Sequence, residues 1–261
     1  MIRLPQLRTG DLSFPAAESA LEEPNGLLAF GGDLSVERLI EAYAHGIFPW
    51  YSEGQPILWW SPDPRMVIAT ASPHVPRRLG RWIRSCTWKI SIDTSFDEVV
   101  RHCAAPRHHG DGTWITDDML EAYIRLHRKG YAHSLEIRDG DGLVGGIYGV
   151  AIGRMFFGES MFSLRSNASK LALLSLCKIL SEKGFSLLDA QVSSDHLETL
   201  GAFEIGRDDF NRRIASLIAQ PGRVGRWTDW ADGLVAREFL RGATAAGDLP
   251  EGTRSTPTAE S

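Results

Sequence analysis

A carboxylate and an amide two residues apart, Asp189 and Gln191, interrupt an apolar segment of the 261-residue sequence. The segment from Ser186 to Val192 predicts a buried strand, on which residues two apart point to the same side. A second predicted strand, residues 155–162, carries Glu159. Polar groups are unfavourable in an apolar sheet unless they are paired or used in chemistry. We therefore predict a polar site formed by these three side chains, with a structural hydrogen-bonded cluster as the alternative.

A predicted helix joins the two strands and must position this site. Ser166 and Asn167 are favourable N-cap residues, a helical pattern follows to Lys183, and Gly184 can take the left-handed conformation that ends a helix. Strand, helix and strand then form one crossover unit. Such units bind ligands at the carboxyl ends of their strands.

The remaining chain predicts further elements around this unit. Helices are predicted near residues 36–45, 77–84, 95–103, 116–130, 208–219 and 229–240, and strands near residues 88–93, 133–138 and 143–152. Residues 1–35 are predicted to be irregular. The segment from Ser61 to Pro64 is the best candidate for a domain boundary, because residues before proline are disfavoured in helices. The small, polar residues 241–261 predict a disordered tail.

Composition limits the possible functions. The net charge of −5 gives no overall basic field, which argues against a large surface for duplex nucleic acid. The first residues lack the apolar core of a signal peptide, and no stretch approaches the ~20 apolar residues that span a bilayer. The three cysteines have no metal-like spacing, and His108 and His109 lack a partner at such a spacing. We therefore predict a cytoplasmic protein with no metal and no membrane contact.

Four arginines share one predicted helix against this acidic background, at spacings that keep them together. They can form an ordinary solvated surface or a local site for nucleic-acid phosphates. This arginine cluster consists of Arg77, Arg78, Arg81 and Arg84.

Several long motifs in a fixed order resemble the leucyl/phenylalanyl-tRNA–protein transferases. They cover nearly the whole chain apart from the tail, and they are NGLLAFGGDLS (25–35), GIFPWYSEGQPILWWSPDPR (46–65), GTWIT (112–116), VGGIYGV (144–150), FGESMFS (157–163), NASK (167–170) and DAQVSSDHLETLGA (189–202). The resemblance implies an α+β fold with an acetyltransferase-like (GNAT-like) mixed sheet flanked by helices. Residues 1–62 would form a small N-terminal α+β domain, and residues 63–240 the catalytic domain.

The resemblance also implies an activity. Such an enzyme transfers leucine or phenylalanine, and also methionine, from aminoacyl-tRNA to the α-amino group of proteins with N-terminal arginine or lysine. The product is marked for degradation by the N-end rule pathway. Aminoacyl-tRNA and these proteins are then the expected partners, no cofactor is implied, and we expect a monomer.

Roles for individual residues follow from the same resemblance. Asp189 and Gln191 match the catalytic pair, and Glu159 is placed in the pocket wall. Trp50 and Trp114 are expected to stack on the terminal adenosine of the tRNA, and the arginine cluster to hold its acceptor stem. The expected pocket for the amino-acid side chain, for which core packing is the alternative, comprises Ile147, Phe156, Leu173, Leu176, Leu180 and Leu188.

Attack of an α-amine on an ester needs no strong general base from the catalytic pair. An α-amine has a pKa of ~7.7–8.0, so part of it is already neutral at pH 7. A glutamine amide is a poor proton acceptor, so we expect the carbonyl oxygen of Gln191 to orient the amine. Asp189 would position Gln191 and offset the positive charge that develops on nitrogen.

Two other functions are weighed against this one. An acyl-CoA N-acetyltransferase on the same fold would need a glycine-containing loop whose amides hold the pyrophosphate at a helix start. Residues 165–170 contain no glycine, which disfavours that activity. A non-catalytic module that binds RNA ends or protein N-termini is disfavoured because Glu159, Asp189 and Gln191 occur together.

Overall fold

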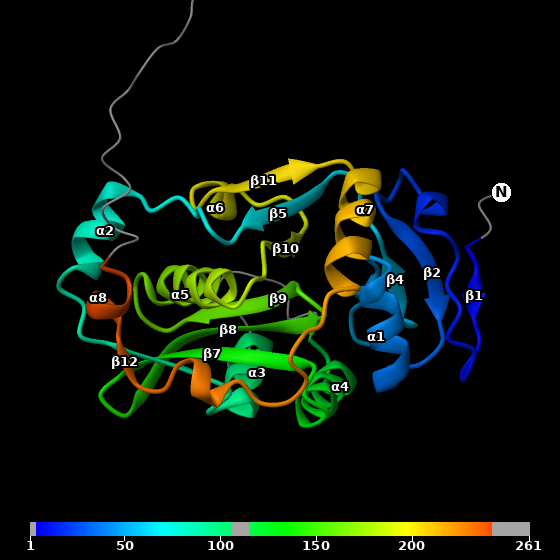
Figure 1. Ribbon diagram of the computed structural model, residues 1–261. Helices are drawn as coiled ribbons and strands as arrows, with labels where there is room; N and C mark the ends of the chain where they lie inside the picture. Colours follow the sequence, from blue (N-terminus) through cyan, green and yellow to red (C-terminus); the bar gives the residue numbers. More distant parts are fainter. Residues whose placement is uncertain (1–3, 106–114, 242–261) are drawn as a thin grey trace, which may run out of the picture.

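The computed structural model describes residues 4–105 and 115–241, and in this part of the chain the strands form two sheets (Figure 1). The smaller sheet has the strand order β1-β2-β4-β3. Its strands are β1 (Gln6–Leu7), β2 (Leu27–Gly31), β3 (Phe48–Pro49) and β4 (Leu58–Trp60). Helix α1 (Val36–Ala44) begins where the Ser35 hydroxyl accepts a hydrogen bond from the Arg38 N–H, as a serine N-cap does. A 3-10 turn, Ala17–Ser19, precedes β2.

The larger sheet has the order β11-β5-β10-β9-β8-β7-β6-β12. Its strands are β5 (Arg65–Ala69), β6 (Lys89–Ile92), β7 (Ala132–Asp139), β8 (Gly142–Ile152), β9 (Met155–Ser163), β10 (Leu187–Gln191), β11 (Ala202–Ile205) and β12 (Leu234–Val235). Strands β9 and β10 pair in parallel, with Leu187 opposite Met155, whereas their outer neighbours pair antiparallel to them. The sheet is therefore mixed, and the predicted strand–helix–strand unit is confirmed.

Helices cover both faces of the larger sheet, as Figure 1 shows. Helix α5 (Ala168–Glu182) lies on one face, and α3 (Phe96–Ala104) and α4 (Asp117–Arg128) lie on the other. The remaining helical segments are α2 (Arg77–Ile83), α6 (Asp195–Glu198), α7 (Arg207–Ile218), the 3-10 turn Thr228–Trp230 and α8 (Ala236–Phe239). None of the helices in the described residues is long and apolar enough to cross a membrane.

One apolar core joins the two sheets. It contains Tyr43 from α1 and Phe48 from the smaller sheet together with Tyr148 and Phe157 from the larger one. The Tyr43 and Phe157 rings lie with their centroids 5.2 Å apart. The smaller sheet and its helix are thus packed against the end of the larger sheet.

Helix α5 is buried on nearly all sides, as a helix of the central crossover must be. It does not begin with the predicted side-chain cap. Asn167 takes a left-handed conformation (φ 72°), its side chain makes no capping bond, and its carbonyl accepts the first helical hydrogen bond from Leu171. Gly184, also left-handed (φ 81°), ends the helix as predicted.

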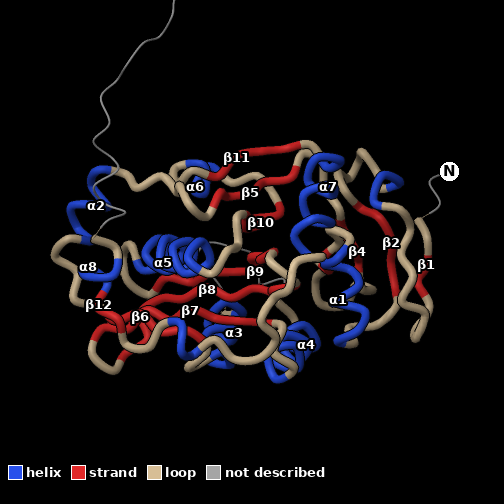
Figure 2. Tube along the Cα trace, in the orientation of Figure 1, coloured by secondary structure: helices blue, strands red, loops and turns tan. Residues whose placement is uncertain are grey.

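Two sequence-based predictions about the chain ends are wrong. Residues 229–240 do not form one helix, and Figure 2 shows the segment between α7 and α8 almost entirely as loop. Gly233 turns the chain in a left-handed conformation (φ 61°), and Leu234 then pairs with Ile90 of β6. Residues 1–35 are not wholly irregular either, since they supply β1 and β2. The expected tail after residue 241 lies outside the described residues.

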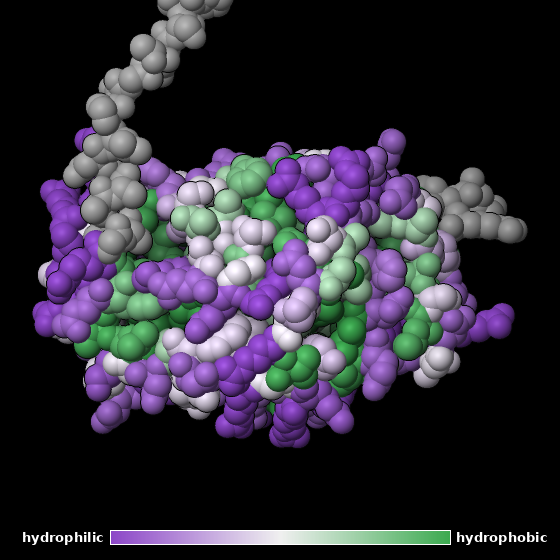
Figure 3. All heavy atoms as spheres, in the orientation of Figure 1, coloured by the Kyte–Doolittle hydropathy of each residue, from purple (hydrophilic) through white to green (hydrophobic). Residues whose placement is uncertain are grey.

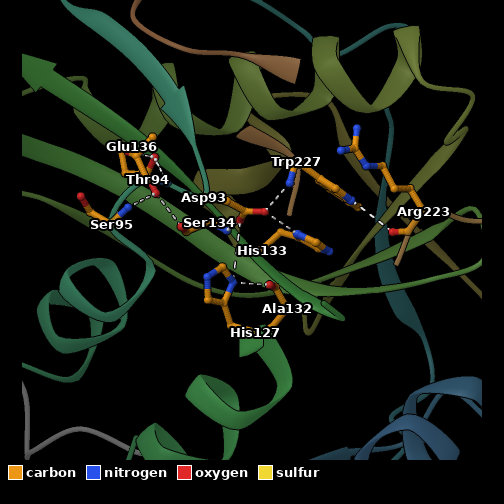
Figure 4. Close-up of polar contacts among 10 residues, drawn as sticks. All are labelled: Asp93, Thr94, Ser95, His127, Ala132, His133, Ser134, Glu136, Arg223 and Trp227. Atoms are coloured by element: carbon orange, nitrogen blue, oxygen red, sulfur yellow. Dashed lines mark hydrogen bonds and ion pairs between the residues drawn. The ribbon is translucent and has the colours of Figure 1, made fainter. Parts of the chain in front are cut away.

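A buried polar network fixes the C-terminal segment to the larger sheet (Figure 4). The Asp93 carboxylate accepts hydrogen bonds from the Trp227 N–H (2.8 Å), the Ser134 N–H (3.0 Å) and Nδ1 of His133 (2.8 Å). The His133 ring stacks on Trp227 with centroids 3.5 Å apart. These contacts join Trp227 of the C-terminal segment to residues of β7 and to the residue that follows β6, which is a structural role.

Candidate active site

Irregularities in β9 and β10, just beyond the residues that pair these two strands in parallel, bring the polar residues together. Glu159 is an extra residue in β9, opposite the Tyr148–Gly149 step of β8. Ala190 is likewise an extra residue in β10 relative to β5. Such bulges bend a strand and redirect its side chains. Gln191, next along the chain, has a φ of 65°, and its side chain reaches Glu159.

The structure joins the three predicted polar residues by hydrogen bonds. Gln191 donates from Nε2 to Oε1 of Glu159 over 2.8 Å, and its backbone N–H donates to Oδ1 of Asp189 over 2.9 Å. Asp189 is fully buried, and Gln191 is 9% exposed. Asp189 therefore holds the backbone of Gln191, while Glu159 holds its amide.

A buried arginine that is not among the predicted site residues completes this cluster. Arg65 donates to both carboxylate oxygens of Asp189, from Nε over 2.9 Å and from Nη2 over 2.7 Å. Its Nη1 donates to the Gly46 carbonyl, and its guanidinium carbon lies 4.8 Å from the ring centroid of Phe48 and 4.6 Å from that of Phe210. The charges of the pair cancel, and the geometry of both groups is fixed.

Two tyrosines from different helices hold Glu159. The hydroxyl oxygen of Tyr43 lies 2.7 Å from Oε1, and that of Tyr123 lies 2.6 Å from Oε2. The two hydroxyl oxygens are also 2.7 Å apart. Burial raises the pKa of Glu159 to about 8, although hydrogen bonds from the tyrosines act in the opposite direction. Burial also raises the pKa of both tyrosines well above 10.

A small apolar pocket of about 80 Å³ opens beside Glu159. Ile147 from β8, Leu173 from α5 and Leu188 from β10 line it, together with Glu159 itself. The other three predicted pocket residues do not line it. Phe156, Leu176 and Leu180 are buried in the same apolar core as the lining residues Ile147, Leu173 and Leu188.

A larger pocket lies at another end of the molecule. Its volume is about 240 Å³, and Ile83 from α2, Leu174 from α5 and Leu240 beyond α8 are among its lining residues. Figure 3 shows apolar residues at the surface in this region, between hydrophilic ones. None of the residues of the polar cluster lines this larger pocket.

Within residues 4–105 and 115–241, no group of three or more His, Cys, Asp or Glu residues can hold a metal ion.

The predicted adenosine-stacking residues are only partly described. Trp50 is 42% exposed, and its ring centroid lies 5.6 Å from that of Trp60. Trp60 donates its indole N–H to the Trp50 carbonyl over 2.6 Å, which fixes the backbone there. Trp50 therefore presents an open, supported ring to solvent. Trp114 lies outside the described residues.

All four members of the arginine cluster are exposed, on α2 and at the residue that ends it. In the described part of the chain, no acidic side chain forms an ion pair with them. Their charges are thus available to an external anion.

Comparisons with known proteins agree on one family. A family model described as leucyl/phenylalanyl-tRNA protein transferase matches residues 67–215, and a model of the N-terminal domain of that transferase matches residues 32–63. A leucyl/phenylalanyl-tRNA–protein transferase of Xanthomonas campestris pv. campestris (strain 8004) is 56% identical over 86% of this chain and 92% of its own. One from Pseudomonas fluorescens (strain Pf0-1) is 54% identical over 84% of this chain and 96% of its own.

Solved structures are similar only at a distance. A functionally unknown conserved protein from Staphylococcus epidermidis covers 65% of this chain and 63% of its own, with a TM-score of 0.36 and 11% identity. L-PGS from Bacillus licheniformis covers 64% of this chain and 53% of its own, with a TM-score of 0.36 and 8% identity.

Proposed function

The chain belongs to the leucyl/phenylalanyl-tRNA–protein transferase family, and we propose that the cluster of Asp189, Gln191 and Glu159 carries out its aminoacyl transfer. The enzyme moves leucine or phenylalanine, and also methionine, from aminoacyl-tRNA to the α-amino group of proteins with N-terminal arginine or lysine. These products enter the N-end rule pathway of degradation.

One observation carries the assignment of the site. The buried, mutually hydrogen-bonded polar cluster and the small apolar pocket share Glu159, which lies just beyond Phe157 and Asp189, the last residues that pair β9 with β10. Binding sites of sheets with crossover helices occur at the carboxyl ends of the strands, and β10 ends at Gln191. An ester carbonyl held there would have an apolar cavity for its side chain on one side and the Gln191 amide on the other.

The reaction needs positioning more than acid–base strength. The α-amine nitrogen attacks the ester carbonyl carbon, the C–N bond forms, the bond to the ribose oxygen breaks, and the amine proton passes to that oxygen. Gln191 can accept a hydrogen bond from the amine on its amide oxygen, because its amide nitrogen is held by Glu159. Holding the two reactants close together in the right orientation can then lower the activation barrier by up to ~7–11 kcal/mol.

The apolar pocket explains the choice of amino acid. An apolar side chain of the substrate gains free energy when it is buried against Ile147, Leu173 and Leu188, whereas a charged side chain would find no partner there. We propose that Phe156, Leu176 and Leu180 belong to the pocket as the packed layer that sets the position of its wall.

The tRNA would bind through a ring and a charged helix. The exposed face of Trp50 offers a stacking surface for the terminal adenosine, with Trp114 as its expected partner. The unpaired arginine cluster on α2 offers charge to the acceptor-stem phosphates.

The two sheets indicate how the chain is organised into domains. We place the boundary between the N-terminal domain (1–62) and an acetyltransferase-like catalytic domain (63–240) where the smaller sheet ends at Trp60 and the larger begins at Arg65. The catalytic cluster is complete within one chain, which supports a monomer. We also propose that the enzyme works in the cytoplasm, where its donor, charged tRNA, is found.

The test is transfer of labelled leucine from charged tRNA to a peptide that begins with arginine. Asp189→Asn keeps the shape of the side chain but removes the negative charge that pairs with Arg65, and Gln191→Ala removes the amide. Each should reduce turnover by about two orders of magnitude or more, with charged tRNA in excess. Wild-type turnover in both variants would refute the site. Labelled acetyl transfer from acetyl-CoA in place of leucine would favour the acetyltransferase alternative.

A further inference from the structure

Three short oxygen–oxygen contacts bear on the charge of Glu159. The hydroxyl oxygens of Tyr43 and Tyr123 and the carboxyl group of Glu159 form a closed carboxyl–tyrosine ring, with contacts of 2.7, 2.7 and 2.6 Å. Each contact has the length of an O–H···O hydrogen bond. Three hydrogen bonds need three protons, and each tyrosine supplies one. With both tyrosine protons used, a hydrogen bond at each of the three contacts places the third proton on the Glu159 carboxyl group.

The contact with Gln191 gives the ring a direction. In one direction around the ring, Oε2 of Glu159 donates to the Tyr123 hydroxyl, and Tyr123 donates to the Tyr43 hydroxyl. Tyr43 then donates to Oε1 of Glu159, which closes the ring and leaves Oε1 as an acceptor. Gln191 donates its amide N–H to that same oxygen over 2.8 Å. The amide oxygen of Gln191 must then point away from Glu159, toward the position of a substrate amine.

The surroundings of Glu159 support the neutral form. Burial is the largest influence on its pKa and raises it to about 8, and the charge of Asp189 acts in the same direction. Arg65 and the two ring tyrosines act in the opposite direction but are smaller influences. Tyr148, on β8, is a further buried phenol nearby, and its hydroxyl has no hydrogen-bond partner among the described residues.

We propose that Glu159 acts as a neutral carboxylic acid, kept so by the carboxyl–tyrosine ring, and that it lets the acceptor α-amine bind uncharged beside Gln191. The inference rests on the proposed function, because it concerns the amine of that reaction. A carboxylate near an amine favours the protonated ammonium, which cannot attack an ester. The Asp189 carboxylate is already neutralised by Arg65, so an ionised Glu159 would be the one unpaired negative charge of the cluster. Glu159 and the ring tyrosines are thus positioning residues that act through Gln191.

The charge of Glu159 can be measured without the reaction. Carbon-13 labelling of the glutamate side chains, with E159Q to assign the signal, gives the titration of this carboxyl group by NMR in the intact wild-type chain. We expect a midpoint near pH 8. A midpoint below about pH 7 overturns the proposal, since the group would then be ionised at neutral pH. This readout is independent of whether leucine transfer takes place.

The pH profile of kcat/KM tests the role in catalysis. In the wild type it should rise as the acceptor amine loses its proton and fall as Glu159 ionises. E159Q keeps an N–H donor and an acceptor for the ring without a titratable proton, so it should recover most of the activity lost in E159A and lack the alkaline fall. If E159Q is instead as inactive as E159A, with a loss of about a hundredfold or more, the carboxylate is the working form and the proposal fails.

Two controls accompany these profiles. Loss of charged tRNA without acceptor is measured at each pH, so that alkaline ester hydrolysis is subtracted. Tyr148→Phe removes a buried phenol next to the ring but outside it, and should keep the wild-type alkaline fall. If Tyr148→Phe abolishes the alkaline fall as E159Q does, the profile reports packing and not the Glu159 proton, which also refutes the proposal.

Discussion

Asp189→Ala should destabilise the folded chain as well as slow the reaction. The substitution leaves the Arg65 guanidinium, which is 1% exposed, without the carboxylate that it binds through two hydrogen bonds. Removing one partner of a buried ion pair typically destabilises by about 3–5 kcal/mol. A domain's whole stability is about 5–15 kcal/mol, so the variant loses a large share of it.

A matched double variant separates charge burial from catalysis. Replacing both partners, Arg65→Met with Asp189→Leu, removes both buried charges, and apolar replacement of buried ion pairs is often neutral or stabilising. We expect the double variant to be more stable than Asp189→Ala and equally inactive. Urea unfolding followed by tryptophan fluorescence measures stability, and transfer is assayed well inside the folded range.

Two results would contradict this reasoning. A destabilisation below about 1 kcal/mol for Asp189→Ala would mean that the guanidinium is solvated rather than buried, as at exposed ion pairs. Full transfer activity in the double variant would show that the Asp189 carboxylate is not needed to hold Gln191.

Three other outcomes test the tRNA surface, the pocket and the titration of a buried acid. Replacing the arginine cluster by alanine should reduce the slope of log K for charged-tRNA binding against log salt concentration by ~0.7–0.9 per lost phosphate contact. An unchanged slope would make α2 an ordinary solvated surface. Leu173→Phe should shift donor preference from Phe toward Leu in competition assays, more than Leu180→Phe does; equal ratios would remove Leu173 from the pocket wall. Burial raises the pKa of Glu136 from 4.5 to about 7. The protonated side chain therefore contributes its full stabilisation of the fold below pH 4.5, and this stabilisation is lost as the pH rises through 7. Glu136→Gln should remove about 3 kcal/mol of this pH dependence of the unfolding free energy, measured by urea unfolding.

Local sequence patterns predicted the central unit well. The alternation of β9, the helical period of α5 and the stop at Gly184 are all set by neighbours a few residues apart. The spacing of Asp189 and Gln191 likewise placed both on a predicted strand, close to Glu159.

The partners of these residues could not be read in the same way. Arg65 lies 124 residues from Asp189, and Tyr43 lies 116 residues from Glu159. Tyr43 and Tyr123 occupy buried positions of amphipathic helices, where an aromatic residue reads as ordinary core. Arg65 alone carried a signal, as a charged residue that opens the apolar strand RMVIA.

The shared core of the two sheets has a consequence for how the protein folds and how it can be divided. Phe48 belongs to the smaller sheet and Tyr43 to its helix, yet the first covers Arg65 and the second completes the ring around Glu159. A fragment that starts at residue 63 would therefore lose two walls of its own catalytic centre. Although the chain has two sheets, we expect a single cooperative unfolding transition, with activity and structure lost together.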